Sequence, residues 1–238
     1  SDQVVFEVPE KQGAYEITGG CAYRPAGVTA NFQPFKGNLT LGFRFSSLEI
    51  RCAILSKQLV RPVRLLLAAP WLDRIELRAE NPAQIMLAGE LVRPVDRSVQ
   101  TRNPVFPVLL RRGVNILTLH IDSPGSRMVL PLELYDPAPF EASESRENWL
   151  LGAFFGFIAC LAVVSVVFGG FSRDAIFFVY ALGLMANLAL IFIQFGLPAM
   201  IFGYAGSPLN TLTVMLTGVA AVLFTEFHRQ YLRISDGR

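Results

Sequence analysis

Few side chains in this sequence are of the types that carry out catalysis or bind metals. The two histidines are His120, within an alternating run typical of a strand, and His228, at the end of the last apolar segment. A metal centre needs several His, Cys or carboxylate ligands close together, and one histidine in each half does not supply them. The sequence contains no Gly-x-Ser-x-Gly elbow, P-loop or dinucleotide fingerprint. We therefore expect no enzyme, no catalytic residue, no metal and no cofactor. The carboxylates Asp73, Glu76, Glu80 and Glu90 are expected at the solvated surface.

Aromatic side chains could form a binding platform, because flat rings stack against the apolar faces of ligands. The candidates are Tyr15, Tyr23, Trp71 and Phe106. Trp71 is the strongest of them, since it directly follows Pro70 at the end of an expected strand. The alternative is that these rings fill a hydrophobic core, where aromatic residues bury large areas. The ligand-binding residues stay unassigned, with Trp71 as the one candidate.

Three cysteines divide between the two halves of the chain. Cys160 lies in a strongly apolar segment and is expected to be a small packing residue. Cys21 and Cys52 lie in the first half, which charge patterning places outside the cytoplasm, where a disulfide is stable. The two could be bonded to each other or buried separately as thiols, since the sequence does not give the distance between them.

The first half of the chain is built from short apolar or alternating runs separated by turn residues. Turn signals include Gly19-Gly20, Asn81-Pro82 and Arg112-Gly113, and no run has the pattern of an amphipathic helix. The expected strands cover 4–8, 14–18, 38–43, 48–55, 62–68, 74–79, 84–87, 105–110, 114–121 and 129–135. Many short strands with such punctuation predict an all-β sandwich of jelly-roll type over residues 1–136.

The last third of the chain has almost no charge. Between Asn148 and Ser172, and again from Ala175 to Thr225, there is no Asp, Glu, Lys or Arg. A bilayer core about 30 Å thick requires roughly 20 such residues in each helix. Glycine and proline residues near Pro198 and Pro208 divide the second run. We therefore expect three membrane-spanning helices, at about 150–168, 175–195 and 209–227, within a membrane module that covers 149–238.

Positive charge sets the expected orientation. Arg229, Arg233 and Arg238 follow the third span and Arg173 lies in the first hairpin, whereas the second hairpin is uncharged. Short loops rich in Lys and Arg stay in the cytoplasm, so the tail is cytoplasmic and the first domain is exported. The chain does not begin with an export signal, and we expect that one was removed. A net charge of +2 gives no reason to expect nucleic-acid binding.

Small and polar residues mark packing faces in the spans. Gly152 and Gly156 lie four residues apart, which allows close approach of another helix, either within the chain or from a second copy. Asn187 and Gln194 are expected to find partners on another helix, because polar groups are costly in lipid. Residues 137–148 are expected to be a linker that Pro137 and Pro139 stiffen, with Ser143 as the cap of the first span.

Several runs of this sequence resemble one family. The exported half contains NLTLGFRF, VRLLLAAPWLDRIELRAE and AGELVRPVDRSVQTRNPVFPVLLRRGVNILTLHID, and the first two spans contain ENWLLGAFFGFIACLAVVSVVFGGFSRDAIFFVYALGLMANLALIF. These runs look like the extracellular sensor domain and the start of the membrane module of bacterial seven-transmembrane receptors with diverse intracellular signalling modules. Leu72-Asp73, Gly89-Glu90, Arg102–Pro107 and Gly113 occupy the family's motif positions, with Glu90 replacing the usual aspartate.

The resemblance implies a carbohydrate-binding-like sandwich in the bacterial periplasm, attached to the inner membrane. It implies a receptor that senses a carbohydrate-like or other small ligand and relays the signal to a cytoplasmic output absent from this chain. The expected partners are therefore the lipid bilayer, a periplasmic small-molecule or protein ligand, and another copy or a cytoplasmic signalling protein. The alternative is a membrane-anchored assembly protein whose periplasmic domain docks another protein.

Overall fold

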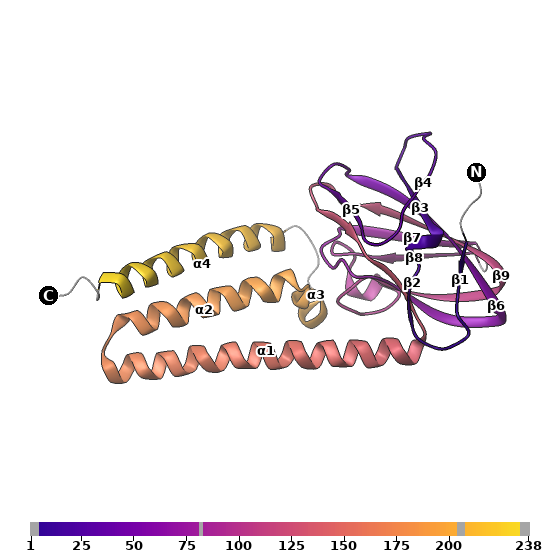
Figure 1. Cartoon of the computed structure of the whole chain (residues 1–238). Helices are drawn as coiled ribbons and strands as arrows, with labels where there is room; N and C mark the ends of the chain where they lie inside the picture. The colour runs from indigo at the N-terminus through magenta and orange to yellow at the C-terminus, as the bar shows by residue number, and fades with distance from the viewer. Residues whose placement is uncertain (1–4, 81–82, 204–207, 234–238) are drawn as a thin grey trace. The chain divides into compact units, whose positions relative to one another are not determined.

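The computed structural model describes residues 5–80, 83–203 and 208–233. The chain divides into two compact units (Figure 1), the first covering Ser1–Ser143 with Gly196–Gly206 and the second Glu144–Phe195 with Ser207–Arg238. We call the strand-containing part of the first unit, up to Ser143, the β-domain. The predicted turn at Asn81-Pro82, residues 204–207 of the second hairpin, and the tail from 234 with Arg238 lie outside the described residues.

The β-domain consists of eleven described strands, joined by turns and two short 3₁₀ helices. The strands are β1 (Phe6–Glu7), β2 (Ala14–Glu16), β3 (Cys21–Pro25), β4 (Gln33–Pro34), β5 (Leu39–Gly42), β6 (Ser47–Leu67), β7 (Arg74–Glu80), β8 (Ala83–Ala88), β9 (Val105–Asp122), β10 (Met128–Leu130) and β11 (Leu132–Tyr135). The 3₁₀ helices are Thr18–Gly20 and Pro94–Asp96.

Strands β6 and β9 pair along almost their whole length and form the frame of the domain. The pairing is antiparallel and shifts where three residues of β6, 57–59, lie opposite Arg112 alone. Such an insertion bends a strand and increases its twist. The bend divides the sheet into two layers. The β7-side layer runs β4, β3, β6, β9, β7, β8, and the β11-side layer runs β2, β11, β6, β9.

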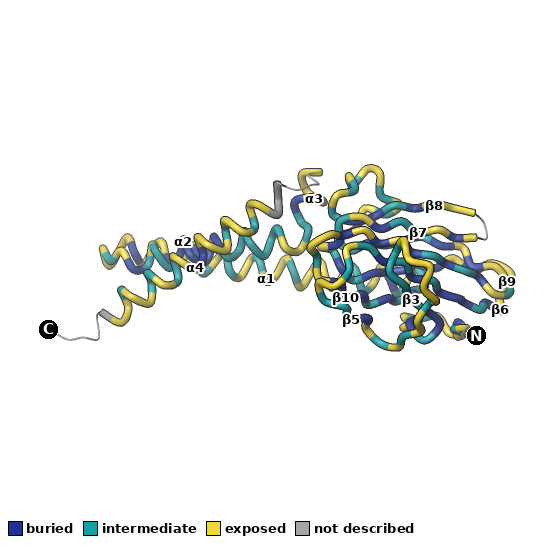
Figure 2. The backbone as a smooth tube through the Cα atoms, turned by 90° about the horizontal axis from the view of Figure 1, so that it is seen from above, coloured by how far each residue is buried: buried dark blue, intermediate teal, exposed yellow. Residues whose placement is uncertain are grey.

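The hydrophobic core lies between these layers. Alternate residues of each strand are buried, as a sheet with one covered face requires, and Figure 2 shows this alternation along the strands. The β7-side layer contributes Leu48, Ile50, Ile54, Ile75, Leu77, Leu117, Leu119 and Ile121, and the β11-side layer contributes Val63, Leu65, Leu67, Phe106, Val108, Leu110, Leu132 and Leu134. The predicted β-sandwich is confirmed.

Several strand boundaries differ from the sequence-based expectation. The expected strands 48–55 and 62–68 are one strand, β6, and 105–110 and 114–121 are one strand, β9. The residues Arg112-Gly113, expected to form a turn, lie where β9 bends, and Gly113 adopts the positive φ of 105° that this bend requires. The expected strand 129–135 is divided at Pro131 into β10 and β11. Strands β3 and β4 were not predicted.

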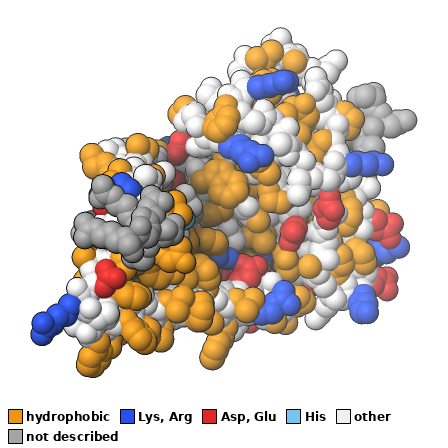
Figure 3. Space-filling model, turned by 60° about the vertical axis from the view of Figure 1, so that its left-hand side comes forward, with side chains coloured by type: hydrophobic (Ala, Val, Ile, Leu, Met, Phe, Trp, Pro, Cys, Tyr) orange, Lys and Arg blue, Asp and Glu red, His pale blue; other side chains and the backbone are white. Residues whose placement is uncertain are grey.

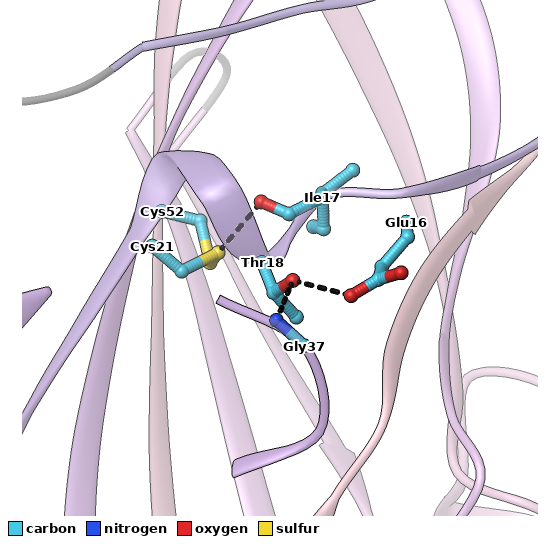
Figure 4. The surroundings of a disulfide bond; sticks show 6 residues. All are labelled: Glu16, Ile17, Thr18, Cys21, Gly37 and Cys52. Atoms are coloured by element: carbon cyan, nitrogen blue, oxygen red, sulfur yellow. Dashed lines mark hydrogen bonds between the residues drawn. A yellow bond between two sulfur atoms is a disulfide. The ribbon is translucent and has the colours of Figure 1, made fainter. Parts of the chain in front are cut away.

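A disulfide joins the central strand β6 to its neighbour β3. Cys21 and Cys52 are directly opposite each other in the antiparallel register, with their Cα atoms 4.0 Å apart. Both side chains lie in the core. Figure 4 shows Thr18 beside this bond, where its hydroxyl donates to Glu16 and accepts from the backbone N–H of Gly37. The segment before β5 is therefore held against the 3₁₀ helix that directly precedes the disulfide-bonded strand β3.

Four helices follow the sandwich: α1 (Pro137–Ser172), α2 (Ala175–Gln194), α3 (Leu197–Phe202) and α4 (Pro208–Arg233). Three segments are long and apolar enough to cross a membrane, namely Pro137–Ser172, Ala175–Gln194 and Thr211–Leu232. Hydrophobic side chains cover much of the helical surface (Figure 3), as expected for helices surrounded by lipid. The prediction of three spans is confirmed, whereas α3 occupies part of the expected hairpin.

The expected linker 137–148 is helical and forms the start of α1. The backbone carbonyl of Asp136 accepts the first helical hydrogen bond, from Phe140 N–H at 3.1 Å. Pro137 and Pro139 occupy the first turn, where the N–H groups have no acceptor within the helix, so proline removes nothing there. Ser143 consequently lies inside α1, and the prediction that it caps the first span is wrong.

Helices α2 and α4 pack together within the second unit. A Cβ atom built on Gly183 of α2 would lie 3.8 Å from Leu223 of α4. Asn187 is one turn further along α2 from Gly183 and is half-buried, whereas Gln194 is exposed at the end of the helix. The start of α2 is capped by Asp174, whose carboxylate accepts from Ile176 N–H at 3.0 Å.

Removing the Cys21–Cys52 bond should destabilise the β-domain, because the bond closes a long loop. A separation of 31 residues corresponds to about 3–4 kcal/mol of loop-closure entropy. We expect a Cys21→Ala, Cys52→Ala variant of the whole chain in detergent to lose about that much unfolding free energy. Denaturant titration followed by Trp71 fluorescence, in a Trp149→Phe background, measures it. Cys160→Ala is the control and should change nothing. If alkylation of the denatured, unreduced chain modifies all three cysteines, no bond exists.

Candidate functional site

The β-domain contains an open cleft at one edge of the sandwich. In the described part of the chain, β8 is the last strand of the β7-side layer, and the first half of β9 is the last strand of the β11-side layer. Between these edges lies a cavity of about 530 Å³, a size common among small-molecule sites. The lining residues are Pro62, Val63 and Arg64 of β6, Gln84, Ile85 and Met86 of β8, Ser98, and Pro107, Val108 and Leu109 of β9.

Strand geometry explains why these residues face the cleft. Successive side chains of a strand point to opposite faces, so Val63 and Val108 turn to the core while Arg64, Pro107 and Leu109 turn outward. The walls expose apolar surface, since Ile85 is 67% and Leu109 44% exposed. Gln84, Ser98 and Arg64 supply the polar groups. The combination is an apolar cleft with a few hydrogen-bonding side chains, as binding sites for small molecules usually have.

The free edge of β9 is unsuited to accept another strand. Leu67 N–H donates to the carbonyl of Pro104 at 3.0 Å, and hydrogen-bonded pairs alternate along an antiparallel ladder. The backbone groups at position 107 therefore point away from β6, towards the free edge. Proline has no N–H to offer there, and proline at an edge prevents the addition of a strand. The cleft is thus better suited to a small ligand than to an extended peptide.

The loop between β8 and β9, which supplies Ser98, is held by Arg97. The Arg97 guanidinium donates to the carbonyls of Val92 (3.0 Å) and Thr101 (3.4 Å). Val99 packs against the cluster formed by Leu66, Val105 and Phe140. These contacts fix the loop beside the cleft.

Three of the carboxylates expected at the solvated surface, Asp73, Glu76 and Glu90, are partly buried instead. Glu90 and Asp73 lie where the turns after β8 and β6 meet, and the backbone N–H of Glu90 donates to the Leu72 carbonyl at 2.7 Å. Burial raises the pKa of both, and the charge of Asp73 raises the pKa of Glu90 further. Gly89 is required here, because a Cβ atom on it would lie 2.5 Å from the carbonyl oxygen of Asp73.

Trp71 lies outside the cleft. It belongs to the turn between β6 and β7, is 40% exposed, and donates from Nε1 to the Arg127 carbonyl at 3.0 Å. The other candidate rings take different places: Phe106 is fully buried in the core, and Tyr15 and Tyr23 pack against it while partly exposed. The four rings therefore do not form one platform, and none of them lines the cleft.

The remaining predicted residues are also dispersed. His120 is exposed on β9 between Glu49 and Glu76 of the neighbouring strands. No group of three His, Cys, Asp or Glu among the described residues could hold a metal ion. Gly152 and Gly156 are exposed on α1, and no described atom outside α1 lies within 4 Å of a Cβ atom built on either. The structure thus forms no close intrachain contact at these glycines.

A buried ion pair that the sequence did not predict lies where the sandwich joins α1. Asp136 directly follows β11 and directly precedes α1, and its carboxylate accepts from Arg61 of β6 at 2.9 and 2.8 Å. Both side chains are about 5% exposed or less. The Gly13 N–H donates to the same carboxylate at 2.9 Å. The Arg61 guanidinium carbon lies over the Tyr15 ring, 5.7 Å from the centre of that ring. We call this arrangement the Arg61–Asp136 joint.

The hydrogen bonds of the joint decide its charge state. Burial by itself would raise the pKa of Asp136, but donation from Arg61 and from the Gly13 N–H outweighs burial and holds the pKa below its ordinary value. Asp136 is therefore ionised at neutral pH. Its carboxylate is bound to the sandwich and its carbonyl begins α1, so a single residue links the two. An aspartate directly before a proline is the one signal of this link that can be read from the sequence.

Breaking one side of the joint should destabilise the β-domain strongly, because the other charge would stay buried without compensation. We expect Asp136→Asn to cost about 3–5 kcal/mol, measured by denaturant unfolding of the whole chain. The double variant Arg61→Met, Asp136→Asn should lose less unfolding free energy than the two single variants lose together. Because the native pKa of Asp136 is depressed, the wild type should lose this stabilisation as the pH falls below about 4, and Asp136→Asn should lack that loss. If the loss of unfolding free energy in the double variant equals the sum of the two single losses, Arg61 and Asp136 are not coupled.

Comparison with known proteins gives a family match within the β-domain. Residues 22–136 match the family model 7TMR-DISM extracellular 2, whose last matched residue is Asp136. No curated protein matches the chain. Among solved structures, a Podospora anserina GH26-CBM35 β-(1,4)-mannanase is similar, with 20% sequence identity and a TM-score of 0.29. That likeness covers 55% of this chain and 29% of the mannanase. The β-domain is thus similar, over residues 22–136, to the 7TMR-DISM extracellular 2 domain.

Proposed function

We propose that this chain is the sensing part of a transmembrane signalling receptor. In this proposal the periplasmic β-domain binds a small ligand in the cleft between β8 and β9, and α1 carries the resulting change into the membrane. The observation that supports it most directly is the Arg61–Asp136 joint, which ties the first residue before α1 into the sandwich through two hydrogen bonds. A domain that only anchors a partner does not need this connection.

The cleft and the joint lie on the same strand. Pro62 and Arg64 line the cleft, and Arg61, directly before them on β6, holds Asp136. The first turn of α1 also packs on the outer face of the β11-side layer, where Phe140 contacts Leu66 and Val105. A ligand that shifts β6 by a fraction of an ångström would therefore act directly on the residues that position the start of α1.

The orientation in the membrane is also part of the proposal. With the β-domain in the periplasm, three spans place Ser172 and the end of α4 on the cytoplasmic side of the bacterial inner membrane. Arg173 between α1 and α2, and Arg229 and Arg233 at the end of α4, agree with this orientation. The signal would pass to a cytoplasmic signalling protein or another copy of the chain. We propose a binding role and no catalysis.

One observation favours the alternative, an assembly protein that docks a partner. At the bend of the sandwich, Leu59 is 79%, Val60 55% and Val114 52% exposed. Exposed apolar side chains that lie close together often mark contacts between proteins. This surface lies midway along the β6–β9 ladder, and none of the three residues lines the cleft.

The orientation predicts which positions react with a membrane-impermeant maleimide. In a Cys160→Ala background, we expect Ser46→Cys, exposed on the β-domain, to be labelled in spheroplasts. Ser172→Cys, at the last residue of α1, should be labelled only after lysis. Both changes replace a serine by a cysteine, so each is the control for the other. The reverse pattern would contradict the proposed topology.

The proposed receptor function predicts that a small molecule binds in the cleft and affects the start of α1. We expect the dialysable fraction of a bacterial extract to raise the unfolding temperature of the chain in nanodiscs. It should also slow hydrogen exchange at residues 137–143. Leu109→Trp, which fills the cleft, should abolish both effects, whereas Leu59→Trp, at the bend, should preserve them. Effects that survive Leu109→Trp, or that come only from the non-dialysable fraction and require Leu59, would favour the assembly protein.

A further inference from the structure

The lining of the cleft indicates the chemical class of its ligand. Seven of the ten lining residues are apolar, and the remaining three are Arg64, Gln84 and Ser98. The lining contains one positive charge, no negative charge and no aromatic ring. Such a surface matches a molecule that has an apolar body and a single anionic group.

Arg64 is the residue that would bind the anionic group. It is half-buried on β6, and its cross-strand neighbours are Pro107 and Tyr135, neither of which carries a negative charge. Its side chain makes no hydrogen bond or ion pair with any residue that the structure describes. The nearest carboxylate by register on the same face of the sheet is that of Glu133, two pairs further along β11, and Glu133 accepts from Tyr135 OH at 2.6 Å.

Three other arginines of the β-domain have a carboxylate partner, unlike Arg64. Arg61, Arg24 and Arg78 each pair with a carboxylate, at 2.8, 2.7 and 2.7 Å. A guanidinium presents a planar fork of donors that matches a carboxylate or phosphate through two parallel hydrogen bonds. In an apolar wall this fork is partly desolvated, which strengthens its interaction with an anion. Arg64 is therefore available for an anion from outside the chain.

The lining fits a sugar poorly. Saccharides are bound by aromatic rings that stack on their apolar faces and by several polar side chains that match their hydroxyl groups. The cleft has no ring, and only Gln84 and Ser98 are uncharged and polar. Trp71, the one exposed tryptophan of the β-domain, lies in a different turn. An extended peptide is disfavoured by Pro107 at the free edge.

We propose that the cleft binds a small amphiphilic anion, a carboxylate with an aliphatic chain. The carboxylate pairs with the Arg64 guanidinium, and the chain covers the exposed surfaces of Ile85, Met86 and Leu109. Gln84 and Ser98 supply further hydrogen bonds to the polar end. This assignment rests on the proposed receptor function, since it names the ligand of that same cleft. The same chemistry occurs in an alkyl phosphate, which the test separates from a carboxylate.

Calorimetry on the full chain in nanodiscs tests the assignment, with octanoate as the probe and empty nanodiscs to subtract partition into the bilayer. We expect octanoate to bind, and hexanoate and butanoate to bind progressively more weakly, by up to about fourfold per methylene. Octanamide has the same shape without the charge and should bind roughly 10- to 100-fold more weakly. Octyl phosphate should bind less tightly than octanoate, and tighter binding of it would instead assign the site to phosphate-bearing ligands.

Matched variants locate the site. Arg64→Gln should weaken octanoate binding roughly 10- to 100-fold, and Ile85→Ser should weaken it while leaving the charge in place. Arg111→Gln removes the same charge from an exposed position of β9 outside the cleft and should bind octanoate as the wild type does. Unfolding temperatures without ligand show that each variant is folded. Equal octanoate affinity in the wild type and Arg64→Gln, or heats no larger than those of empty nanodiscs, would overturn the assignment.

The test also separates this inference from the function on which it rests. If the dialysable extract acts through the cleft while octanoate and octyl phosphate do not bind, the receptor function stands and the ligand class is wrong. If neither the extract nor the probes act through the cleft, both proposals fall.

Discussion

The pairing of β6 with β9 is the constraint on which the rest of the β-domain depends. These strands run through both layers, and the insertion of residues 57–59 opposite Arg112 turns one long ladder into two faces of a sandwich. The same bend places the first half of β9 at an edge and so opens the cleft beside β8. The disulfide at Cys52 and the joint at Arg61 both hold β6 to other parts of the domain. Core, cleft and helix attachment are therefore consequences of one paired frame.

The Arg61–Asp136 joint fixes the direction in which the chain leaves β11 more than it adds to the net stability of the domain. Removing two charges from water costs several kcal/mol for each ion, and their attraction offsets this only when the remaining hydrogen bonds are formed. Here the Gly13 N–H and the Pro9 carbonyl complete the pair. A hydrophobic pair of the same volume could fill the space, but it would not fix the direction in which the chain leaves β11. The paired charges hold Asp136 in one orientation, and with it the first turn of α1.

The sequence predicted the parts of the fold that follow from composition and periodicity. Long uncharged runs gave the three spans, and alternating apolar residues gave most strands. Features that depend on the partner strand were missed. Arg112-Gly113 resembles a turn, and only the pairing with β6 makes it a bend within β9. Pro137 and Pro139 resemble a linker because proline breaks helices, yet both fall in the first turn, where proline is tolerated. The cleft is lined by positions 62–64, 84–86 and 107–109, which no local sequence pattern connects. Trp71, the candidate that the sequence offered, lies instead in the turn between β6 and β7.

Two arginines three residues apart on β6 have opposite surroundings, and the contrast bears on function. Arg61 turns inward and is neutralised by Asp136, whereas Arg64 turns into the cleft and meets no carboxylate of the described chain. A half-buried, unpaired cation gives up part of its hydration without a compensating partner. A purely structural role would be served better by an aliphatic residue among Pro62, Pro107 and Leu109. A binding role explains the charge, because an anion that binds only the native state supplies the missing partner and stabilises the domain by mass action. The site of that stabilisation lies three residues from the joint that sets the start of α1.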